Sequence, residues 1–219
     1  MRINAGNYKF RKIVLPEDIR PTTEKVREAI CSMVMDHIPG ANVLDLFAGS
    51  GVLGLEALSR GAAHCWFNDL SRKHIAFVRE NIANCRAESV STVSNKDFRK
   101  CLASLTEPMD IILLDPPYRD GLYEEALEKI MEYQLLAEDG VIVAEHLYEL
   151  PLPEEIAGLK RIKLKKYGTI GVDIYIMASP EDEPKDEPEN EGEDTPEENV
   201  PDFSLDESRL GKSDSADNR

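Results

Sequence analysis

Short apolar runs alternate with helical patterns along the first two thirds of the chain, and this rhythm restricts the fold more than any other feature. The apolar runs are rich in β-branched residues and cover residues 43–47, 65–68, 89–93, 111–114 and 141–144. Helical patterns fill the intervals at residues 51–60, 71–84, 97–105 and 123–133. Strands that alternate with helices in this way build a parallel sheet whose faces are covered by helices. The sequence therefore predicts an α/β fold.

The alternation of strand-like and helical segments ends on both sides of this series. Residues 160–167 and 172–177 are both strand-like and flank a glycine-containing turn, which predicts a closing antiparallel hairpin. Upstream, Pro21 and Thr22 or Thr23 open a predicted helix with apolar residues at helical spacing. Before that helix, residues 1–15 are expected to form a small basic β-hairpin. We thus expect one domain over residues 1–178, in which residues 1–38 are an N-terminal extension.

The acidity of the chain is concentrated at its end. The whole chain carries a net charge of -16, and residues 179–219, with 16 acidic and 4 basic residues, account for -12 of it. This segment has too few apolar residues to bury a core, so we expect an acidic, disordered tail.

Several other classes of protein are disfavoured by the sequence. The four cysteines include no Cys-x-x-Cys pair, and the histidines show no metal-ligand spacing, so we expect reduced thiols and no metal site. The first residues lack the apolar segment of a signal peptide, and no apolar run approaches the roughly 18 residues of a membrane helix. We expect a cytoplasmic protein that does not enter a membrane.

A glycine-rich turn connects the first predicted strand to a helix within residues 43–54. Its glycines, Gly49, Gly51 and Gly54, let the backbone approach a ligand, and the helix N-terminus offers free amide donors. By itself the spacing fits a dinucleotide site, with Asp69 placed to bind a ribose at the end of the next strand. A turn that needs glycine only for packing is the other interpretation.

Asp45 separates two possible cofactors because it lies four residues before the first glycine. A carboxylate there would repel a pyrophosphate, whereas S-adenosylmethionine carries a cationic sulfonium and an ammonium group. We therefore predict an S-adenosylmethionine site in which Asp69 binds the ribose and Asp97 the adenine amino group, although Asp97 also suits a helix N-cap. The predicted cofactor-binding residues of this region are Asp45, Phe47, Ala48, Gly49, Ser50, Gly51, Asp69, Leu70, Asp97 and Phe98.

The fourth predicted strand delivers the segment Asp115-Pro116-Pro117-Tyr118 to the sheet edge where ligands bind in α/β folds. The two prolines have no amide hydrogens, so this stiff loop presents only acceptors. The Asp115 carboxylate and the Pro116 carbonyl would orient an exocyclic base amine, at guanine N2 or adenine N6, for methylation. Tyr118 would stack on the extruded base. We predict these four residues to be catalytic; an ordinary Pro-Pro turn beside an incidental acid and aromatic is the alternative.

These motifs resemble the RsmD family of 16S ribosomal RNA guanine-N2 methyltransferases over residues 1–178. The resemblance is carried by residues 1–6, 20–23, 26–29, 45–51, 55–62, 115–118 and 145–146. It implies a Rossmann-like class I methyltransferase fold with a seven-stranded, mostly parallel sheet, S-adenosylmethionine as donor, and a guanine of 16S ribosomal RNA within a small ribosomal subunit as acceptor. It also implies that Arg20, Thr22 and Thr23 lie over the active site, near cofactor and base. Asp69 departs from the family, in which Glu is common there. We expect a monomer.

Two basic clusters suit contact with RNA despite the net acidity of the chain. The first, which we expect to bind the substrate, consists of Arg2, Lys9, Arg11 and Lys12. The second consists of Lys160, Arg161, Lys163, Lys165 and Lys166 and is either an RNA surface or a solvated face. The acidic tail either competes with RNA for these clusters or serves solubility or partner binding.

Two other functions remain open at this point. An adenine-N6 or protein glutamine N-methyltransferase can use a similar acid-or-Asn-Pro-Pro-Tyr segment. A non-enzymatic RNA-binding assembly protein could keep the same fold, although the intact Asp45, Asp69, Asp115 and Tyr118 disfavour it.

Overall fold

A computed structural model of the protein describes residues 1–19, 22–117 and 121–179. Within these residues, eight strands form one sheet in the order β3-β2-β1-β4-β5-β8-β7-β6. The strands are β1 (Asn42–Asp45), β2 (His64–Asn68), β3 (Ser91–Ser94), β4 (Met109–Leu114), β5 (Leu136–Leu147), β6 (Glu155–Ile156), β7 (Leu159–Tyr167) and β8 (Ile170–Met177). The helices are α1 (Glu24–Met33), α2 (Val52–Ser59), α3 (Arg72–Cys85), α4 (Phe98–Leu102) and α5 (Leu122–Glu132), with short 3-10 helices η1 (Met35–His37) and η2 (Glu88–Val90).

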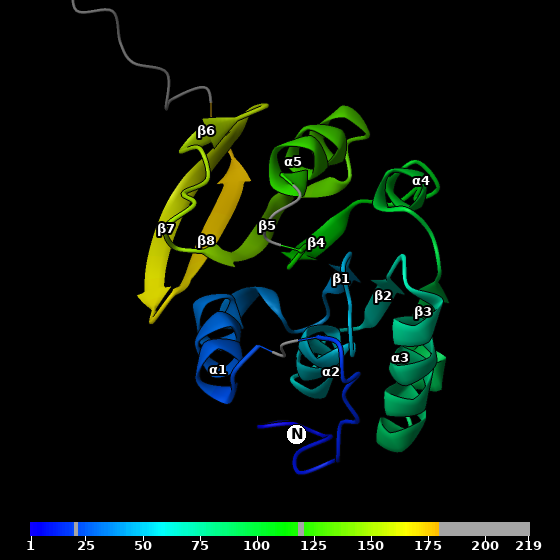
Figure 1. Ribbon diagram of the computed structural model, residues 1–219. Helices are drawn as coiled ribbons and strands as arrows, with labels where there is room; N and C mark the ends of the chain where they lie inside the picture. Colours follow the sequence, from blue (N-terminus) through cyan, green and yellow to red (C-terminus); the bar gives the residue numbers. More distant parts are fainter. Residues whose placement is uncertain (20–21, 118–120, 180–219) are drawn as a thin grey trace, which may run out of the picture. The chain divides into compact units, whose positions relative to one another are not determined.

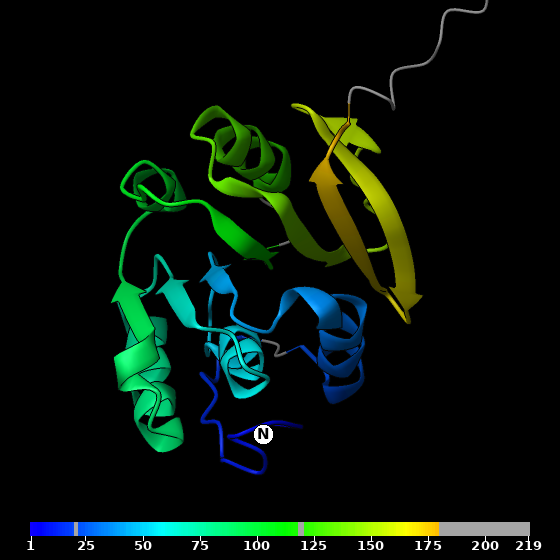
Figure 2. The same cartoon turned by 180° about the vertical axis from the view of Figure 1, so that it is seen from behind.

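Helices cover both faces of this sheet, as the alternating pattern predicts (Figure 1). On one face α1, α2 and α3 contribute Val26, Leu55 and Val78 to a core that includes alternate residues of the central strands. On the other face α4 and α5 contribute Leu102 and Leu127 to a second core. Figure 2 shows the same layers from behind. Strands buried on both faces are near-continuous apolar runs, which explains why the sequence revealed them.

Five strands, β3, β2, β1, β4 and β5, are parallel, so their carboxyl ends lie at one edge of the sheet. The register of β4 and β5 pairs Leu114 with Ala144. Asp115 and Glu145 therefore follow at neighbouring positions, where the two strands reach this edge. The predicted glycine turn and the predicted catalytic segment both emerge here.

The C-terminal antiparallel hairpin is confirmed as β7 and β8, and β8 pairs with β5. The predicted number of seven strands is one too few, because the two-residue strand β6 pairs with β7. β5 is also longer than residues 141–144, since Leu136 already pairs with Met109 of β4. Such short or polar pairings leave no apolar run in the sequence.

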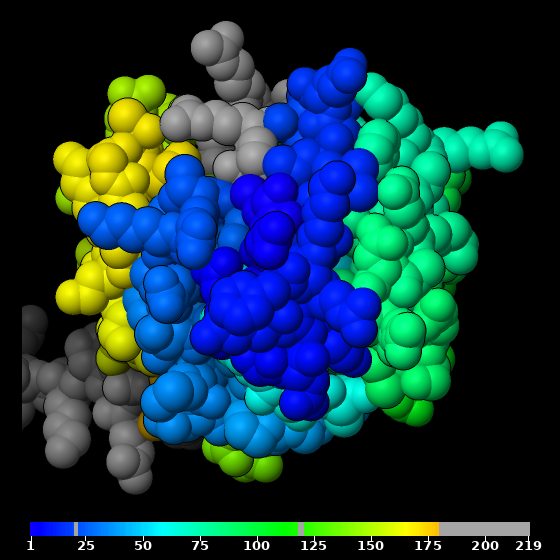
Figure 3. Space-filling view, turned by 90° about the horizontal axis from the view of Figure 1, so that it is seen from below, coloured from blue at the N-terminus to red at the C-terminus, as the bar shows by residue number. Residues whose placement is uncertain are grey.

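The predicted N-terminal β-hairpin is confirmed in part: its two arms are antiparallel, with one bridge between Arg2 and Lys12 and a backbone bond from Ile3 to Arg11 (3.0 Å), but they form no continuous strands. The backbone turns through left-handed conformations at Gly6 (φ 79°) and Phe10 (φ 69°), which interrupt a ladder. The segment lies across the helices, as the dark blue region between α1 and α3 in Figure 3 shows. The following helix is confirmed as α1, whose N-cap is Thr23.

All four cysteines are buried free thiols. Among the described residues, no cluster of three potential ligands could hold a metal ion, and none of the described helices has the length and apolarity needed to cross a membrane. Residues 180–219, nearly all of the predicted tail, lie outside the described residues.

Candidate active site

A cavity of about 600 Å³ lies at the carboxyl ends of the parallel strands. Its volume is typical of sites for small ligands. The glycine turn after β1, the ends of β2 and β3, and the segment after β4 all contribute to its lining. The predicted cofactor residues on the lining are Thr22, Asp45, Phe47, Ala48, Gly49, Ser50, Asp69, Leu70, Asp97 and Phe98, and the predicted catalytic residues there are Asp115, Pro116 and Pro117.

Two predicted cofactor-binding residues that the structure describes, Gly51 and Thr23, are not part of this lining. Gly51 is the N-cap of α2, with a φ of 76° that favours glycine. Thr23 is exposed and accepts a hydrogen bond from the Val26 amide (3.4 Å) as the N-cap of α1. Tyr118 and Arg20 lie outside the described residues. The roles predicted for these four residues stay predictions.

Two carboxylates at the strand ends hold the backbone of the glycine turn. Asp69 Oδ2 accepts from the Gly49 amide (2.9 Å), and Asp45 Oδ2 accepts from the Gly54 amide (3.0 Å). A side chain at Gly54 would collide with Phe67, since a Cβ there would lie 2.4 Å from its ring. Gly54 is thus required for packing, while the other glycines of the turn lie beside the cavity or adopt a left-handed conformation.

Asn68 is a supporting residue that the sequence did not reveal. It is buried at the end of β2, where its Nδ2 donates to the carbonyls of Leu46 (3.2 Å) and Lys96 (3.1 Å). Its Oδ1 accepts from Ser94 Oγ at 2.7 Å. One amide therefore fixes the turns that follow three neighbouring strands.

His74 and Asp18 also line the cavity without having been predicted. His74 Nδ1 lies 3.2 Å from Asp69 Oδ1, and its Nε2 lies 3.4 Å from Asp18 Oδ2. A hydrogen bond from Lys73 to Asp18 (3.1 Å) lowers the pKa of Asp18. His74 thus connects the segment before α1 to the acid predicted to bind a ribose.

Asn81, in the middle of α3, makes a second connection of this kind. The side chain is fully buried. Its Oδ1 accepts from the Val14 amide (2.8 Å), while its Nδ2 donates to the carbonyls of Val14 (2.9 Å) and Ser50 (2.9 Å). A single amide therefore ties the N-terminal segment to the glycine turn. No sequence pattern indicates this role, because an isolated polar residue in a helix resembles any solvent-facing one.

Replacing Asn81 by Leu should lower the free energy of unfolding by about 2–4 kcal/mol, since the buried Ser50 carbonyl and two partly buried backbone groups of Val14 lose their partner. It should also weaken cofactor binding by displacing the Ser50 carbonyl. Urea unfolding and calorimetric titration measure the two effects. Asn84→Leu, at an exposed position of the same helix, should change stability by less than about 0.5 kcal/mol. Equal stability of the two variants would show that the Asn81 contacts are dispensable.

Asp115 lies in an unusually acidic environment for a buried strand end. Thr22 Oγ1 donates to its Oδ2 at 3.5 Å. Burial, reinforced by the carboxylates of Glu145 and Asp45, raises the pKa of Asp115 well above its usual range. Burial likewise raises the pKa of Asp45 to about 7. The hydrogen bond from the Gly54 amide lowers this pKa, and the nearby Asp69 carboxylate raises it, but burial has the largest effect. The cavity floor thus favours a cationic or hydrogen-bond-donating ligand.

The rest of the cavity offers an apolar surface and further acceptors. The rings of Phe47 and Phe98 have centroids 5.5 Å apart, and Leu70 is 72% exposed beside them. Asp97 caps α4 by accepting from the Arg99 amide (3.0 Å), so its N-cap interpretation is confirmed. A planar base, hydroxyl groups and a cationic group all find matching chemistry here, as S-adenosylmethionine requires. A pyrophosphate would be repelled by the carboxylates that line this cavity.

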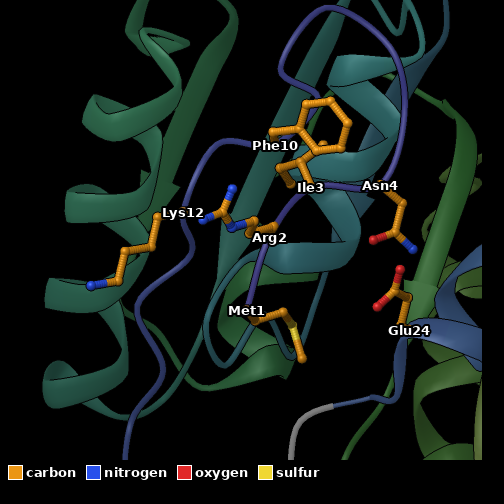
Figure 4. A pocket seen from close by; sticks show the side chains of 7 residues that line it. All are labelled: Met1, Arg2, Ile3, Asn4, Phe10, Lys12 and Glu24. Atoms are coloured by element: carbon orange, nitrogen blue, oxygen red, sulfur yellow. The ribbon is translucent and has the colours of Figure 1, made fainter.

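A second cavity, of about 530 Å³, lies beside the N-terminal segment. Arg2 and Lys12, two of the predicted RNA-binding cations, line it together with Phe10. In Figure 4 Asn4 and Glu24 point toward one another beside it. Phe10 is 65% exposed, and Lys9 lies over its ring at 4.9 Å from the centroid. Arg11 is exposed nearby in sequence but does not line the cavity.

Comparisons with known proteins agree with this site. The family model "Conserved hypothetical protein 95" matches residues 1–176. Ribosomal RNA small subunit methyltransferase D of Escherichia coli is 34% identical over 177 residues, which are 80% of this chain and 89% of that protein. YlbH of Bacillus subtilis, named as an rRNA methyltransferase, is 42% identical over 180 residues, which are 80% of this chain and 98% of YlbH.

Solved structures support the same relationship. YhhF of Escherichia coli, described as a methyltransferase, superimposes with a TM-score of 0.74 at 34% identity, covering 81% of this chain and 98% of that one. The fold alone is shared with SMU.776, a methyltransferase structure with bound SAH, at a TM-score of 0.56 and 17% identity over 69% of this chain and 48% of that one. The chain therefore belongs to the RsmD family of methyltransferases, enzymes of the Rossmann-like class I fold that use S-adenosylmethionine.

Proposed function

We propose that this enzyme transfers a methyl group from S-adenosylmethionine to the exocyclic N2 amine of a guanine in small-subunit (16S) ribosomal RNA, acting as a cytoplasmic monomer on a small ribosomal subunit or its precursor. The proposal rests on one observation. Asp115, Pro116 and Pro117 line the same cavity as the acidic glycine turn. The names of the relatives support ribosomal RNA as the substrate. The choice of guanine N2 rests on the family resemblance.

The cavity suits the chemistry of a weakly nucleophilic base amine. The Asp115 carboxylate and the Pro116 carbonyl accept hydrogen bonds from the amine, which orients its lone pair and stabilises the positive charge that develops on nitrogen. S-adenosylmethionine supplies the methyl group as a sulfonium electrophile. The raised pKa of Asp115 makes its carboxylate a better acceptor for the departing proton than an ordinary Asp. Tyr118 stacks on the base in this proposal.

The pKa of Asp45 leads to a prediction for cofactor affinity. Because its carboxyl group has a pKa of about 7, it is largely neutral below that pH and becomes a carboxylate above it. A cationic cofactor favours the carboxylate, so affinity for S-adenosylmethionine should rise roughly tenfold between about pH 6 and pH 8. Calorimetric titrations across this range test the effect. Asp45→Asn should show weaker, nearly pH-independent binding, and a flat profile in the wild type would contradict the prediction.

The same shift has the opposite effect on the cofactor-free protein. The unfolded chain releases the Asp45 proton near its usual pKa, whereas the folded chain keeps it until about pH 7. Stability contributed by this group is therefore present at low pH and declines as the pH rises toward 7.

The N-terminal cluster supplies an RNA-contacting surface in this proposal. Arg2 and Lys12 offer cations on the lining of the second cavity, and Lys9 lies beside the exposed ring of Phe10. Cations attract phosphates, and an exposed ring can stack on an unpaired base. The buried attachment of the segment through Asn81 fixes this surface to the domain that contains the cavity.

The test of the proposed function is transfer of labelled methyl from S-adenosylmethionine to small ribosomal subunits from cells that lack the gene. Digestion to nucleosides and mass spectrometry should reveal labelled N2-methylguanosine. Labelled N6-methyladenosine would assign the activity to adenine instead. Label in protein alone, or none at all, would reject an RNA substrate.

A further inference from the structure

The second basic cluster lies on β7, near one end of the sheet order, where three of its side chains are exposed. Arg161 is engaged in the fold, because its guanidinium contacts Glu154 (2.7 Å), Asp173 (3.5 Å) and the Leu152 carbonyl (3.1 Å). The exposed cations are Lys163, Lys165 and Lys166. Within the described part of the chain, none of these three forms an ion pair with an acid. They therefore leave positive charge facing solvent.

The strand register places these lysines at the same sheet edge as the catalytic segment. Asp115 and Glu145 are neighbours beyond the pairing of Leu114 with Ala144. Glu145 pairs with Val172, and Val172 pairs with Lys165. Three strand spacings thus separate Lys165 from Asp115, a distance of roughly 14 Å.

The side-chain direction agrees with this placement. Val172 and Ile174 belong to the core on the side of α1, α2 and α3, and they pair with Lys165 and Lys163. Directly paired residues project from the same face of a sheet. Lys163 and Lys165 therefore stand on the face that also carries α1, beyond the cover of that helix.

Lys166, the next residue, projects from the opposite face of β7, so the exposed cations and a neighbouring aromatic side chain surround the end of this strand. Tyr148, which directly follows β5, is 38% exposed, and Lys166 lies over its ring at 4.2 Å from the centroid. Exposed cations with an adjacent aromatic ring are typical of surfaces that bind single-stranded nucleic acid through phosphates and stacked bases. An acidic or apolar partner surface would not match both features.

We propose that Lys163, Lys165, Lys166 and Tyr148 form a docking surface for the RNA strand that flanks the target base. The surface holds backbone phosphates on the β7 side of the cavity while the target base enters beside Asp115. This inference rests on the proposed function, because it assumes that the substrate is RNA. It favours the RNA-surface interpretation of the second basic cluster over that of a solvated face.

The test compares the triple variant K163Q/K165Q/K166Q with the matched variant R79Q/R86Q/K100Q. The matched variant also removes three exposed cations: Arg79 lies on α3, Arg86 directly follows it, and Lys100 lies on α4. These helices precede and follow β3, at the opposite end of the sheet order from β7. Binding of the labelled enzyme to small ribosomal subunits is measured by fluorescence anisotropy over a range of salt concentrations, which requires no turnover. SAH affinity by calorimetry verifies the fold of both variants.

The β7 variant should bind the subunits about tenfold more weakly at low salt, and the slope of log affinity against log salt should fall by about 2, since each lost phosphate contact removes roughly 0.7. Its SAH affinity should stay at the wild-type value. The matched variant should change binding by less than about twofold. If both variants bind alike and keep the wild-type slope, β7 is a solvated face and the proposal fails. Absence of methyl transfer by the wild type would instead reject the proposed function.

Discussion

Replacing Asp115 by Ala is expected to lower kcat for methyl transfer by roughly 100- to 1000-fold, the cost of removing one electrostatic group from a preorganised site. The variant loses the acceptor that orients the amine and stabilises its developing charge. Affinity for S-adenosylmethionine should change far less, because Asp45, Asp69 and the glycine turn remain in place. Single-turnover methylation and calorimetric titration separate the two quantities.

Two further substitutions sharpen this test. Asp115→Asn keeps an oxygen acceptor but no charge, so its activity should fall between that of the wild type and that of the alanine variant. Asp110→Ala changes the same residue type near the other end of β4, where Asp110 accepts from the Asn42 amide (2.7 Å). That variant should keep its turnover. Near wild-type turnover in Asp115→Ala would remove the catalytic segment from the mechanism.

Replacing Arg27 by Leu is expected to lower the free energy of unfolding by about 3–5 kcal/mol, the usual cost of breaking a buried ion pair. Arg27 is fully buried in α1, with its Nε 3.6 Å from Glu56 Oε1. Its Nη2 also donates to the Arg2 carbonyl (3.1 Å) and to Asn4 Oδ1 (2.9 Å). The substitution removes one of the two cationic partners of Glu56, which keeps Arg60 and the Asn4 amide, and it detaches the N-terminal segment from the helix.

Denaturant unfolding with a matched surface substitution checks this expectation. Arg79→Leu, at an exposed position of α3, should change stability by less than about 0.5 kcal/mol. Adding Glu56→Gln to Arg27→Leu should recover part of the loss, because an uncharged amide costs less to bury than a carboxylate. A loss no greater in Arg27→Leu than in Arg79→Leu would show that the buried pair adds nothing to stability.

Much of the fold was predictable because its signals are local. The central parallel strands are short apolar runs, and glycines mark the turn at residues 49–54. The order of motifs along the chain also located the cavity, since parallel strands bring Asp45, Asp69 and Asp115 to one edge. For these three acids, the position directly at or after a predicted strand was enough to predict their place in the fold.

The supporting residues were not predictable, because their partners are distant in sequence. Asn68, His74 and Asn81 act through hydrogen bonds and ion pairs to backbone and side chains that only the folded chain brings near. The short pairing of the N-terminal hairpin has the same cause. Its turn at Gly6 was recognisable, and Ile3 does bond to Arg11 (3.0 Å), but the turn itself also bonds to α2, where Asn7 donates to the Ser59 carbonyl (2.7 Å).

The attachment of Val14 to Asn81 also constrains the order in which the chain folds. These residues are 67 positions apart, and contacts of such long range form late because a large loop must close first. During synthesis the first residues leave the ribosome well before α3 exists, so they have no place to dock. We expect the glycine turn to reach its final geometry only when α3 packs and captures both the Ser50 carbonyl and the N-terminal segment.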